Sequence, residues 1–473
     1  MGQKMKLLVS PLLLMILVLT TSSSNSQSII KTLPGYHGDL PFKLETGYVG
    51  VGENEEVELF YYFAESQRNP EEDPIIFNMP GGPGYSGLYS FAYGREGPLS
   101  FNDEHGLDNI TFTLNPNSWT KVANMIFLDI PAGVGFSYAK TTQGWLSSDS
   151  VMASHASAFI RKFLINHPMF LNNPLYIAGI SYMGLINPLV TLQLYEGNER
   201  GDQPWLNIQG YILCGPLTDK FRDFNSRFEF AHRMALISDD IYKLGTENCN
   251  GNYINTHTSN SLCAHSLQRY EECTSQINLD NILLPPCNES NPMPYCTEYS
   301  DRALHSWGNN EVVQRALNIH MGTIGTWYLH NSTMHYAEGK NDTFCYSYDI
   351  FSSFSHHKKL VAKGCQALVF SGDHDMAFPY VGVEQWIALL NISVETPWAP
   401  FFIKGYGYVG GYETKYAQKD FSLTFATVRG AGHSVPVYKP EESFDVVSRW
   451  LTSQNYSRSS RMQEGRAIYA AST

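Results

Sequence analysis

The stretch "PLYIAGISYMGLINPLV", residues 174–190, decides the fold. Its apolar first half predicts a buried strand, and the residues after Ser181 predict a helix. A serine in such a turn is either a cap of the following helix or an exposed nucleophile. Ile180 before it and Met183 two residues after it crowd the turn, so the surrounding sequence has to separate these two roles.

The same alternation of strand and helix extends in both directions from this stretch. Residues 73–84, 123–138 and 208–215 each predict an apolar strand that ends in a Gly-containing loop, and residues 151–168 have helical spacing. Strands that alternate with helices indicate an α/β fold with a mostly parallel sheet. The strand pattern stops near residue 216 and resumes at 365–375 and 423–433, before a closing helix at 440–451. We therefore predict a core of residues 27–215 and 311–452, interrupted at 216–310 by a helical, Cys-containing excursion or lid.

Three polar residues follow apolar strands in the order Ser181, Asp375 and His433. This is the chain order of the catalytic triad in the α/β-hydrolase fold, where the histidine takes the serine proton and the aspartate orients the imidazole. Each residue alone is more often structural, as a helix cap, a turn residue or a surface histidine. Their joint occurrence favours the hydrolase fold, and the "PGGPG" loop at 80–84 then predicts Gly82 and Tyr182 as backbone donors of an oxyanion hole.

The N-terminal segment and the sequons indicate export. Residues 1–26 have the layout of a secretory signal peptide, with Lys4 and Lys6 before an apolar run from Leu7 to Leu19 that is too short to span a bilayer. Residues 453–473 are polar and predict a disordered tail. The expected location is the secretory pathway, with either the extracellular space or a vacuole as destination. N-x-S/T sequons then predict glycosylation at Asn109, Asn288, Asn331, Asn341, Asn391 and Asn455.

Composition argues against several other classes of function. The net charge of -13 comes without any basic run, which argues against a nucleic-acid partner. No later segment is apolar enough to predict a membrane partner. The cysteines and histidines lack zinc-ligand spacing, so we expect neither a metal nor an organic cofactor.

Several long motifs, in fixed order over about residues 30–452, resemble the serine carboxypeptidase family, in particular its plant serine carboxypeptidase-like members. The matching segments are "GGPGYSG", "NPNSWTKVANMIFLDIPAGVGFSYA", "FSGDHDM" and "VRGAGHSVPVYKPEES". The resemblance implies the triad Ser181, Asp375 and His433. It also implies one of two reactions through an acyl-serine: removal of a C-terminal residue, or transfer of an acyl group from a 1-O-β-glucose ester to an alcohol.

Departures from the family pattern cluster around this site. At three positions where the family's peptidases bind the terminal carboxylate of the substrate, this chain has Pro80, Gly94 and Ile180. The second position carries a one-residue insertion, with Glu96 beside it as a shifted substitute. The resemblance places Pro80, Gly81 and Ile180 at the substrate, where Pro80 and Ile180 offer no polar side chain. Met183 is larger than the small residue usual in the tight turn after the nucleophile.

The cysteines also differ from the family pattern, and one disulfide is missing both of its cysteines. A long-range disulfide of the family is lost at both ends, because the aligned positions are Tyr85 and His330. The resemblance implies that Cys249–Cys263 and Cys287–Cys296 are retained, with Cys273 as a competitor, and Cys345 and Cys365 remain unassigned.

Three functions remain open on the sequence. The first is acyl transfer from glucose esters to an alcohol, with a small-molecule donor and acceptor. The second is hydrolysis of a peptide or an ester. The third is a weakly active or non-catalytic companion, a paralogous partner subunit that supports an active relative. The intact triad favours an enzyme, whereas the residues around the nucleophile favour altered specificity or the companion.

Overall fold

The computed structural model describes residues 27–102, 106, 109–254, 260–288, 290, 293, 295–332 and 346–454. The predicted signal peptide, the sequons at Asn341 and Asn455, Cys345 and nearly all of the predicted tail lie outside these residues. Within the described part of the chain, none of the helices combines the length and the apolar character that crossing a membrane requires.

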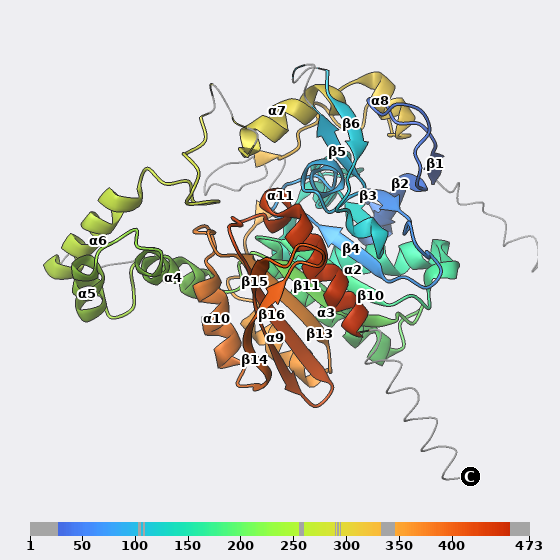
Figure 1. The fold of residues 1–473 in the computed structure, drawn as a ribbon. Coiled ribbons are helices and arrows are strands. Elements are labelled where there is room, and N and C mark those ends of the chain that lie inside the picture. Colours follow the sequence, from blue (N-terminus) through green and yellow to red (C-terminus); the bar gives the residue numbers. More distant parts are fainter. Residues whose placement is uncertain are drawn as a thin grey trace, which may run out of the picture.

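A 12-stranded sheet forms the centre of the molecule (Figure 1). Its strand order is β1-β2-β3-β7-β4-β10-β11-β13-β16-β15-β14, with β8 paired to β3. The six strands from β7 to β16 run parallel, and antiparallel strands flank them on both sides. The parallel strands are β7 (Asn124–Leu128), β4 (Ile75–Met79), β10 (Leu175–Ile180), β11 (Ile208–Cys214), β13 (Gln366–Gly372) and β16 (Phe421–Val428).

Both faces of this sheet are buried, which explains why the central strands are continuous apolar runs rather than alternating ones. Along β10, for example, Ile177 faces one hydrophobic cluster and Tyr176 and Ala178 face the other. Helices α2 (Asp149–Asn166), α3 (Met183–Arg200) and α9 (Phe354–Ala362) contribute to the first cluster. The second cluster is covered by α7 (Thr297–Gly308), α8 (Glu311–Ala316) and the closing helix at 440–454.

The excursion leaves the sheet after β11. Helices α4 (Lys220–Arg233), α5 (Asp239–Asn248) and α6 (Ser261–Thr274) project to one side of the core (Figure 1). They form a small hydrophobic cluster of their own around Phe228 and Ile241, and α4 packs against α10 (Tyr380–Leu389). The helical part runs on through α8 to Ala316, a few residues beyond the predicted boundary at 310.

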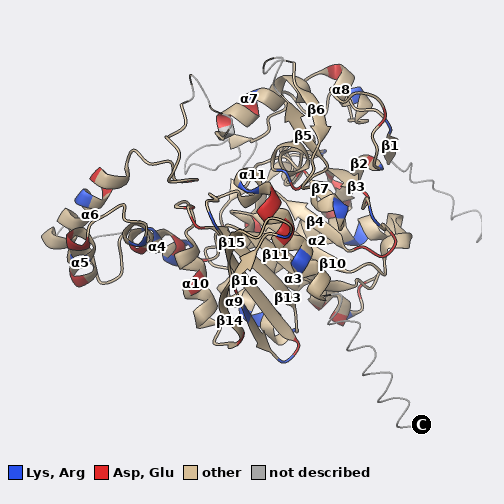
Figure 2. Ribbon diagram, viewed as in Figure 1, with Lys and Arg blue, Asp and Glu red and all other residues tan. Residues whose placement is uncertain are grey.

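The remaining strands and short helices connect and flank these layers. Acidic and basic residues are interspersed over the ribbon rather than separated onto different faces (Figure 2). The remaining strands are β1 (Ser28–Ile30), β2 (Leu44–Val51), β3 (Val57–Ala64), β5 (Leu99–Asn102), β6 (Thr111–Leu114), β8 (Tyr138–Ala139), β9 (Ser147–Ser148), β12 (Tyr346–Ser347), β14 (Ser393–Phe402) and β15 (Val409–Gln418), with helix α11 at Val435–Tyr438.

Candidate active site

Ser181 occupies the sharp turn between β10 and α3. Its backbone has φ 62°, in the left-handed region that non-glycine residues rarely adopt. Neighbouring backbone holds this conformation, because the Ser181 N–H donates to the Cys214 carbonyl at 3.0 Å and the Leu217 N–H donates to the Ser181 carbonyl at 3.0 Å. The turn is thus fixed by the end of the adjacent strand β11, and this is the geometry that exposes a nucleophile at a strand end.

The structure shows how the turn accommodates the large side chain of Met183. This side chain is fully buried in the hydrophobic cluster under α3. A Cβ added at Gly179 would lie 2.6 Å from the Met183 Cβ, so the missing side chain of Gly179 provides the space that Met183 occupies. Ile180 points the other way and lines the pocket beside Ser181.

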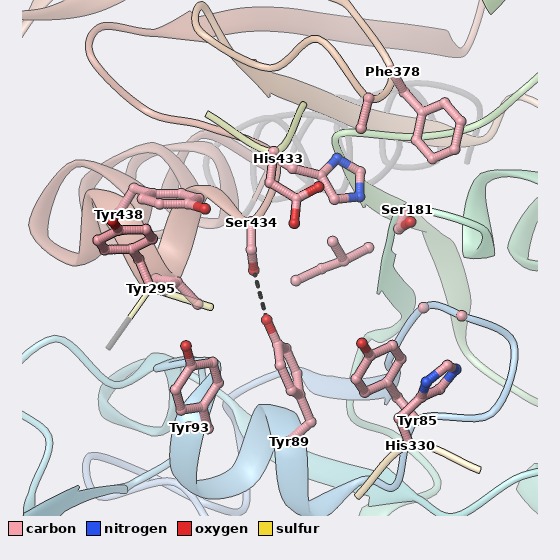
Figure 3. A pocket seen from close by; sticks show the side chains of 16 residues that line it. Tyr85, Tyr89, Tyr93, Ser181, Tyr295, His330, Phe378, His433, Ser434 and Tyr438 are labelled. Carbon is pink, nitrogen blue, oxygen red and sulfur yellow. Dashed lines mark hydrogen bonds between the residues drawn. The ribbon is translucent and has the colours of Figure 1, made fainter. Parts of the chain in front are cut away.

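His433 and Asp375 form a hydrogen-bonded pair at the ends of β16 and β13. His433 Nδ1 lies 2.8 Å from Asp375 Oδ2, and the other carboxylate oxygen accepts the Phe378 N–H at 3.0 Å. This pairing assigns the proton to Nδ1 and leaves Nε2 as the ring nitrogen available to the serine. Ser181 and His433 line the same pocket (Figure 3).

The electrostatics of the pair follow from its burial. Burial alone lowers the pKa of His433, but the negative charge of Asp375 and its hydrogen bond outweigh burial and raise this pKa above the ordinary value. Gly215 closes the space behind the pair, where a Cβ would lie 2.7 Å from the His433 carbonyl and 3.2 Å from Asp375 Oδ2. A side chain at this position would therefore displace the imidazole.

The sequence did not predict that the excursion helps to hold the triad. The His433 N–H donates to the Asp280 carbonyl at 2.6 Å, and the N–H groups of Met376 and Ala377 donate to the Leu279 carbonyl at 2.9 and 2.8 Å. One short segment of the excursion thus bridges the histidine loop and the aspartate loop. These hydrogen bonds use backbone groups that almost every residue carries, so they do not depend on which side chains are present and could not be predicted from the sequence.

The two predicted oxyanion donors belong to the loop after β4 and to the residue that follows Ser181. In the described part of the chain, neither the Gly82 N–H nor the Tyr182 N–H is hydrogen-bonded to a backbone carbonyl. Gly81 lies against the serine, because a Cβ there would be 2.7 Å from the Ser181 Cβ and 2.9 Å from the Ile180 carbonyl. The Tyr182 hydroxyl donates to the buried Asp149 at 2.8 Å, which anchors the residue that carries the second donor.

A pocket of about 310 Å³ opens in front of Ser181 (Figure 3). Its wall opposite the triad consists largely of tyrosines. The charge of Asp280 acts on His433, Tyr93 and Tyr438, which places its carboxylate in this space. The described residues that line the pocket include no lysine or arginine; they are Gly81, Gly82, Tyr85, Tyr89, Tyr93, Ile180, Ser181, Asp280, Tyr295, His330, Ala377, Phe378, His433, Ser434, Val437 and Tyr438.

A π-helical turn at Tyr89–Tyr93 directly precedes Gly94, the position to which the resemblance assigns a one-residue insertion. Its signature is the hydrogen bond from the Gly94 N–H to the Tyr89 carbonyl, five residues back, at 2.5 Å. A π-turn is how a helix absorbs one extra residue, and it is frequent at functional sites. Here it brings both Tyr89 and Tyr93 to the pocket, and the Tyr89 hydroxyl donates to Ser434 at 3.4 Å.

Tyr85 and His330 meet where the family has a disulfide. Their rings stack with centroids 4.2 Å apart and planes 15° apart, and the two residues form an isolated antiparallel β-bridge. The bridge ties the oxyanion loop to the segment before Asn331. An aromatic stack therefore joins the two segments without a covalent bond and also lines the pocket.

Of the remaining predicted substrate positions, some line the pocket and others do not. Gly81 and Ile180 line the pocket, whereas Pro80 is buried at the end of β4, and neither it nor Gly94 is among the lining residues. Glu96 does not reach the pocket either. It is fully buried beside Ser90, and burial raises its pKa to about 8, so this carboxyl is protonated at neutral pH.

The structure contains both disulfides that the resemblance implied, Cys249–Cys263 and Cys287–Cys296. Among the described cysteines, Cys273 is an exposed free thiol, and Cys214 and Cys365 are buried free thiols. The predicted glycosylation sites at Asn109, Asn288 and Asn391 are exposed. Asn331 is half-buried, and its amide nitrogen donates to the Gly133 carbonyl at 2.7 Å, so this side chain is held by the fold.

Comparison with known proteins was made for the sequence and for the structure. The family model described as serine carboxypeptidase matches residues 34–453. Serine carboxypeptidase-like 16 of Arabidopsis thaliana is 42% identical over 444 residues, which cover 94% of this chain and 98% of the relative. Serine carboxypeptidase-like 2 of the same plant is 41% identical over 444 residues, covering 94% and 96% of the two chains.

Among solved structures, the fold matches Kex1(Δ)p, described as a prohormone-processing carboxypeptidase from Saccharomyces cerevisiae. The TM-score is 0.67 at 17% sequence identity, and the match covers 87% of this chain and 92% of the yeast chain. At this identity the likeness concerns the fold, and it confirms the α/β-hydrolase architecture expected from the strand order.

Proposed function

The chain belongs to the serine carboxypeptidase family, and from this premise we propose that it is an acyltransferase that works through an acyl-serine at Ser181. The donor is a 1-O-glucose ester and the acceptor is an alcohol. Peptide or ester hydrolysis is the nearest alternative, since it uses the same acyl-serine and differs only in the attacking hydroxyl.

One observation supports transfer from a neutral ester over removal of a C-terminal residue. A carboxypeptidase has to bind the free carboxylate at the end of its substrate, which requires hydrogen-bond donors or a positive charge. The pocket at Ser181 has the carboxylate of Asp280 and, among its described lining residues, no lysine or arginine. Ile180 adds an apolar surface next to the nucleophile. This lining disfavours an anionic substrate end and accepts an uncharged ester.

The proposed reaction has two matched halves. In the first, Ser181 Oγ attacks the ester carbonyl while His433 Nε2 takes the hydroxyl proton, and the N–H groups of Gly82 and Tyr182 stabilise the oxyanion. His433 then returns the proton to the departing sugar oxygen as the ester C–O bond breaks, which leaves the acyl-serine.

In the second half, the acceptor hydroxyl attacks the acyl-serine. His433 takes the acceptor's proton and returns it to Ser181 Oγ, so the free serine and a new ester are formed and the proton balance closes. Asp375 stays ionised and holds the imidazolium in both halves. An acceptor bound in place of water decides whether the acyl group is transferred or hydrolysed.

The test uses the purified mature protein with 1-O-benzoyl-β-glucose as donor, a panel of aliphatic and aromatic alcohols, and a blocked dipeptide in a parallel reaction. Chromatography with mass spectrometry follows free benzoate, new benzoyl esters and released amino acid. We expect new esters that vanish in Ser181→Ala and no release from the dipeptide. Release of amino acid in place of ester formation would establish the peptidase.

Labelling with a fluorophosphonate separates the third hypothesis from the first two. Stoichiometric modification of the Ser181 peptide that disappears in His433→Ala is expected of any enzyme that uses this triad. A folded protein that takes no label and transfers nothing would instead be the non-catalytic companion, and its effect on a co-expressed relative would survive Ser181→Ala. Secretion or delivery to a vacuole, for which the signal-peptide layout of residues 1–26 speaks, is proposed together with this function.

A further inference from the structure

A second cavity of about 420 Å³ adjoins the pocket at Ser181. The two cavities share Tyr93, Tyr295, Val437 and Tyr438 in their linings, so they meet at these side chains, and we call the second cavity the second compartment. Figure 3 shows Tyr93, Tyr295 and Tyr438 together on the side of the pocket away from Ser181. The second compartment therefore lies beyond these tyrosines as seen from the nucleophile.

The second compartment is lined by rings. Beyond the shared tyrosines it presents Phe101 of β5 and Tyr299 of α7. Phe101 stacks on Tyr93 with centroids 5.6 Å apart and planes 15° apart, and it lies 6.2 Å from Tyr299 at 30°. Rings at these separations and angles pack on one another in offset stacks, and their remaining edges and faces give the cavity an aromatic lining against which a planar aromatic ligand can pack.

The compartment also has a positive charge that the first pocket lacks. Arg95 follows the π-turn, lines the second cavity and acts electrostatically on Tyr93. Asp280 carries the opposite charge and lines only the first pocket. The two compartments thus differ in the sign of their charged side chain, with the negative Asp280 on the side of Ser181 and the positive Arg95 on the far side.

We propose that this second compartment is a binding site for a planar aromatic ligand with an acidic group, with its ring on Phe101 and Tyr299 and its anion at Arg95. If the proposed acyl transfer is correct, this ligand is the acceptor, and its hydroxyl extends past Tyr93 and Tyr438 toward Ser181. That assignment rests on the proposed function, whereas the binding itself does not.

The test measures binding without catalysis, on the Ser181→Ala protein. The probe is 7-hydroxycoumarin-3-carboxylate, a fluorescent planar acid, and the matched neutral probe is 7-hydroxycoumarin. We expect saturable binding of both, with the acid bound more tightly. Phe101→Ala should raise both dissociation constants about tenfold through loss of the stacking surface. Arg95→Gln should raise only that of the acid, about threefold, because the charge pair is partly exposed.

Two controls keep the result interpretable. Trp205→Ala removes an exposed ring on another part of the surface and should change neither constant. If Phe101→Ala unfolds, Phe101→Leu removes the flat ring and keeps an apolar side chain of similar size. The proposal is overturned if neither probe binds, or if the Phe101 and Arg95 variants bind both probes like the parent. Binding without any transfer in the donor assay would retain the site and reject only its role as acceptor site.

Discussion

The two walls of the pocket at Ser181 are built by different means. The catalytic wall consists of loops at the ends of the parallel strands β4, β10, β13 and β16, and backbone hydrogen bonds and close glycine contacts fix it. The aromatic wall comes from outside the sheet, from the π-turn, α11, the Tyr85–His330 stack and, in the excursion, Asp280 and Tyr295. Its shape depends on side chains whose rings contact one another edge to face or at a tilt. We therefore expect substitutions in the aromatic wall to change which substrate binds while the catalytic groups stay in place.

The largest expected effect on the labelling rate comes from comparing two carboxylates, Asp375 in the catalytic wall and Asp280 in the aromatic wall. Asp375→Asn should slow fluorophosphonate labelling of Ser181 about 10⁴-fold, because the imidazole loses the partner that fixes its tautomer. Asp280→Asn keeps the backbone carbonyl that holds His433 and should slow labelling by less than about tenfold. Mass spectrometry measures the rate of Ser181 labelling in both variants. Equal reductions of this rate would mean that Asp280 is as important for the reactivity of Ser181 as Asp375, against the division into two walls.

A methyl group in the catalytic wall should have the next largest effect. Gly81→Ala places a Cβ 2.7 Å from the Ser181 Cβ and 2.9 Å from a backbone carbonyl, so the oxyanion loop has to move. A shift of about 1 Å costs roughly 10²-fold in rate. Gly325→Ala is the matched control, since nothing lies within 4 Å of its added Cβ. Comparable labelling rates in the two variants would show that the loop tolerates movement.

The pH dependence of labelling tests the His433–Asp375 pair. The general base has to be neutral, so a raised pKa of His433 moves the rise of the labelling rate to a pH above the ordinary value near 6.5. In Asp375→Asn the negative charge is gone and burial, which lowers the pKa, remains, so the midpoint should fall. Titration of His433 by NMR in both proteins measures the two midpoints. A midpoint that rises in Asp375→Asn would contradict this account.

The smallest effect on rate is expected at the Tyr85–His330 stack of the aromatic wall. The double variant Tyr85→Cys, His330→Cys should form a disulfide, because the two residues are partners in an antiparallel β-bridge. A long-range disulfide contributes about 2–4 kcal/mol to the free energy of unfolding, which denaturation with and without reductant can measure. Labelling of Ser181 should change less than threefold. A large loss of labelling would place this stack in the catalytic wall.

The catalytic wall was largely predictable from the sequence. Parallel strands are buried on both faces and appear as apolar runs, and their ends are marked by Gly-containing turns that carry Ser181, Asp375 and His433. The structure pairs the last two and brings all three to one edge of the sheet, as their order implied. The sequence left open whether Met183 is accommodated or disturbs the turn; in the structure its side chain is buried, and Gly179 leaves space for its Cβ.

The aromatic wall was not predictable to the same degree. The resemblance indicated an insertion at Gly94, but the π-turn that precedes this residue depends on how the flanking segments are held. The hairpin of β14 and β15 also escaped notice. Strand β14 is an exposed edge strand with two prolines, so it lacks both apolar continuity and regular alternation. Contacts such as that between Asp280 and His433 arise from tertiary placement, which local pattern does not encode.

The two disulfides of the excursion also determine its covalent topology. Cys249–Cys263 and Cys287–Cys296 each close a short loop within this insertion. A protease that cut one peptide bond inside either loop would produce two polypeptides that stay joined through the cystine. Such a protein would migrate as one species on a non-reducing gel and separate into two fragments after reduction. The segment at Leu279 and Asp280 that braces the triad lies outside both loops, so it would remain continuous with α6 after either cut.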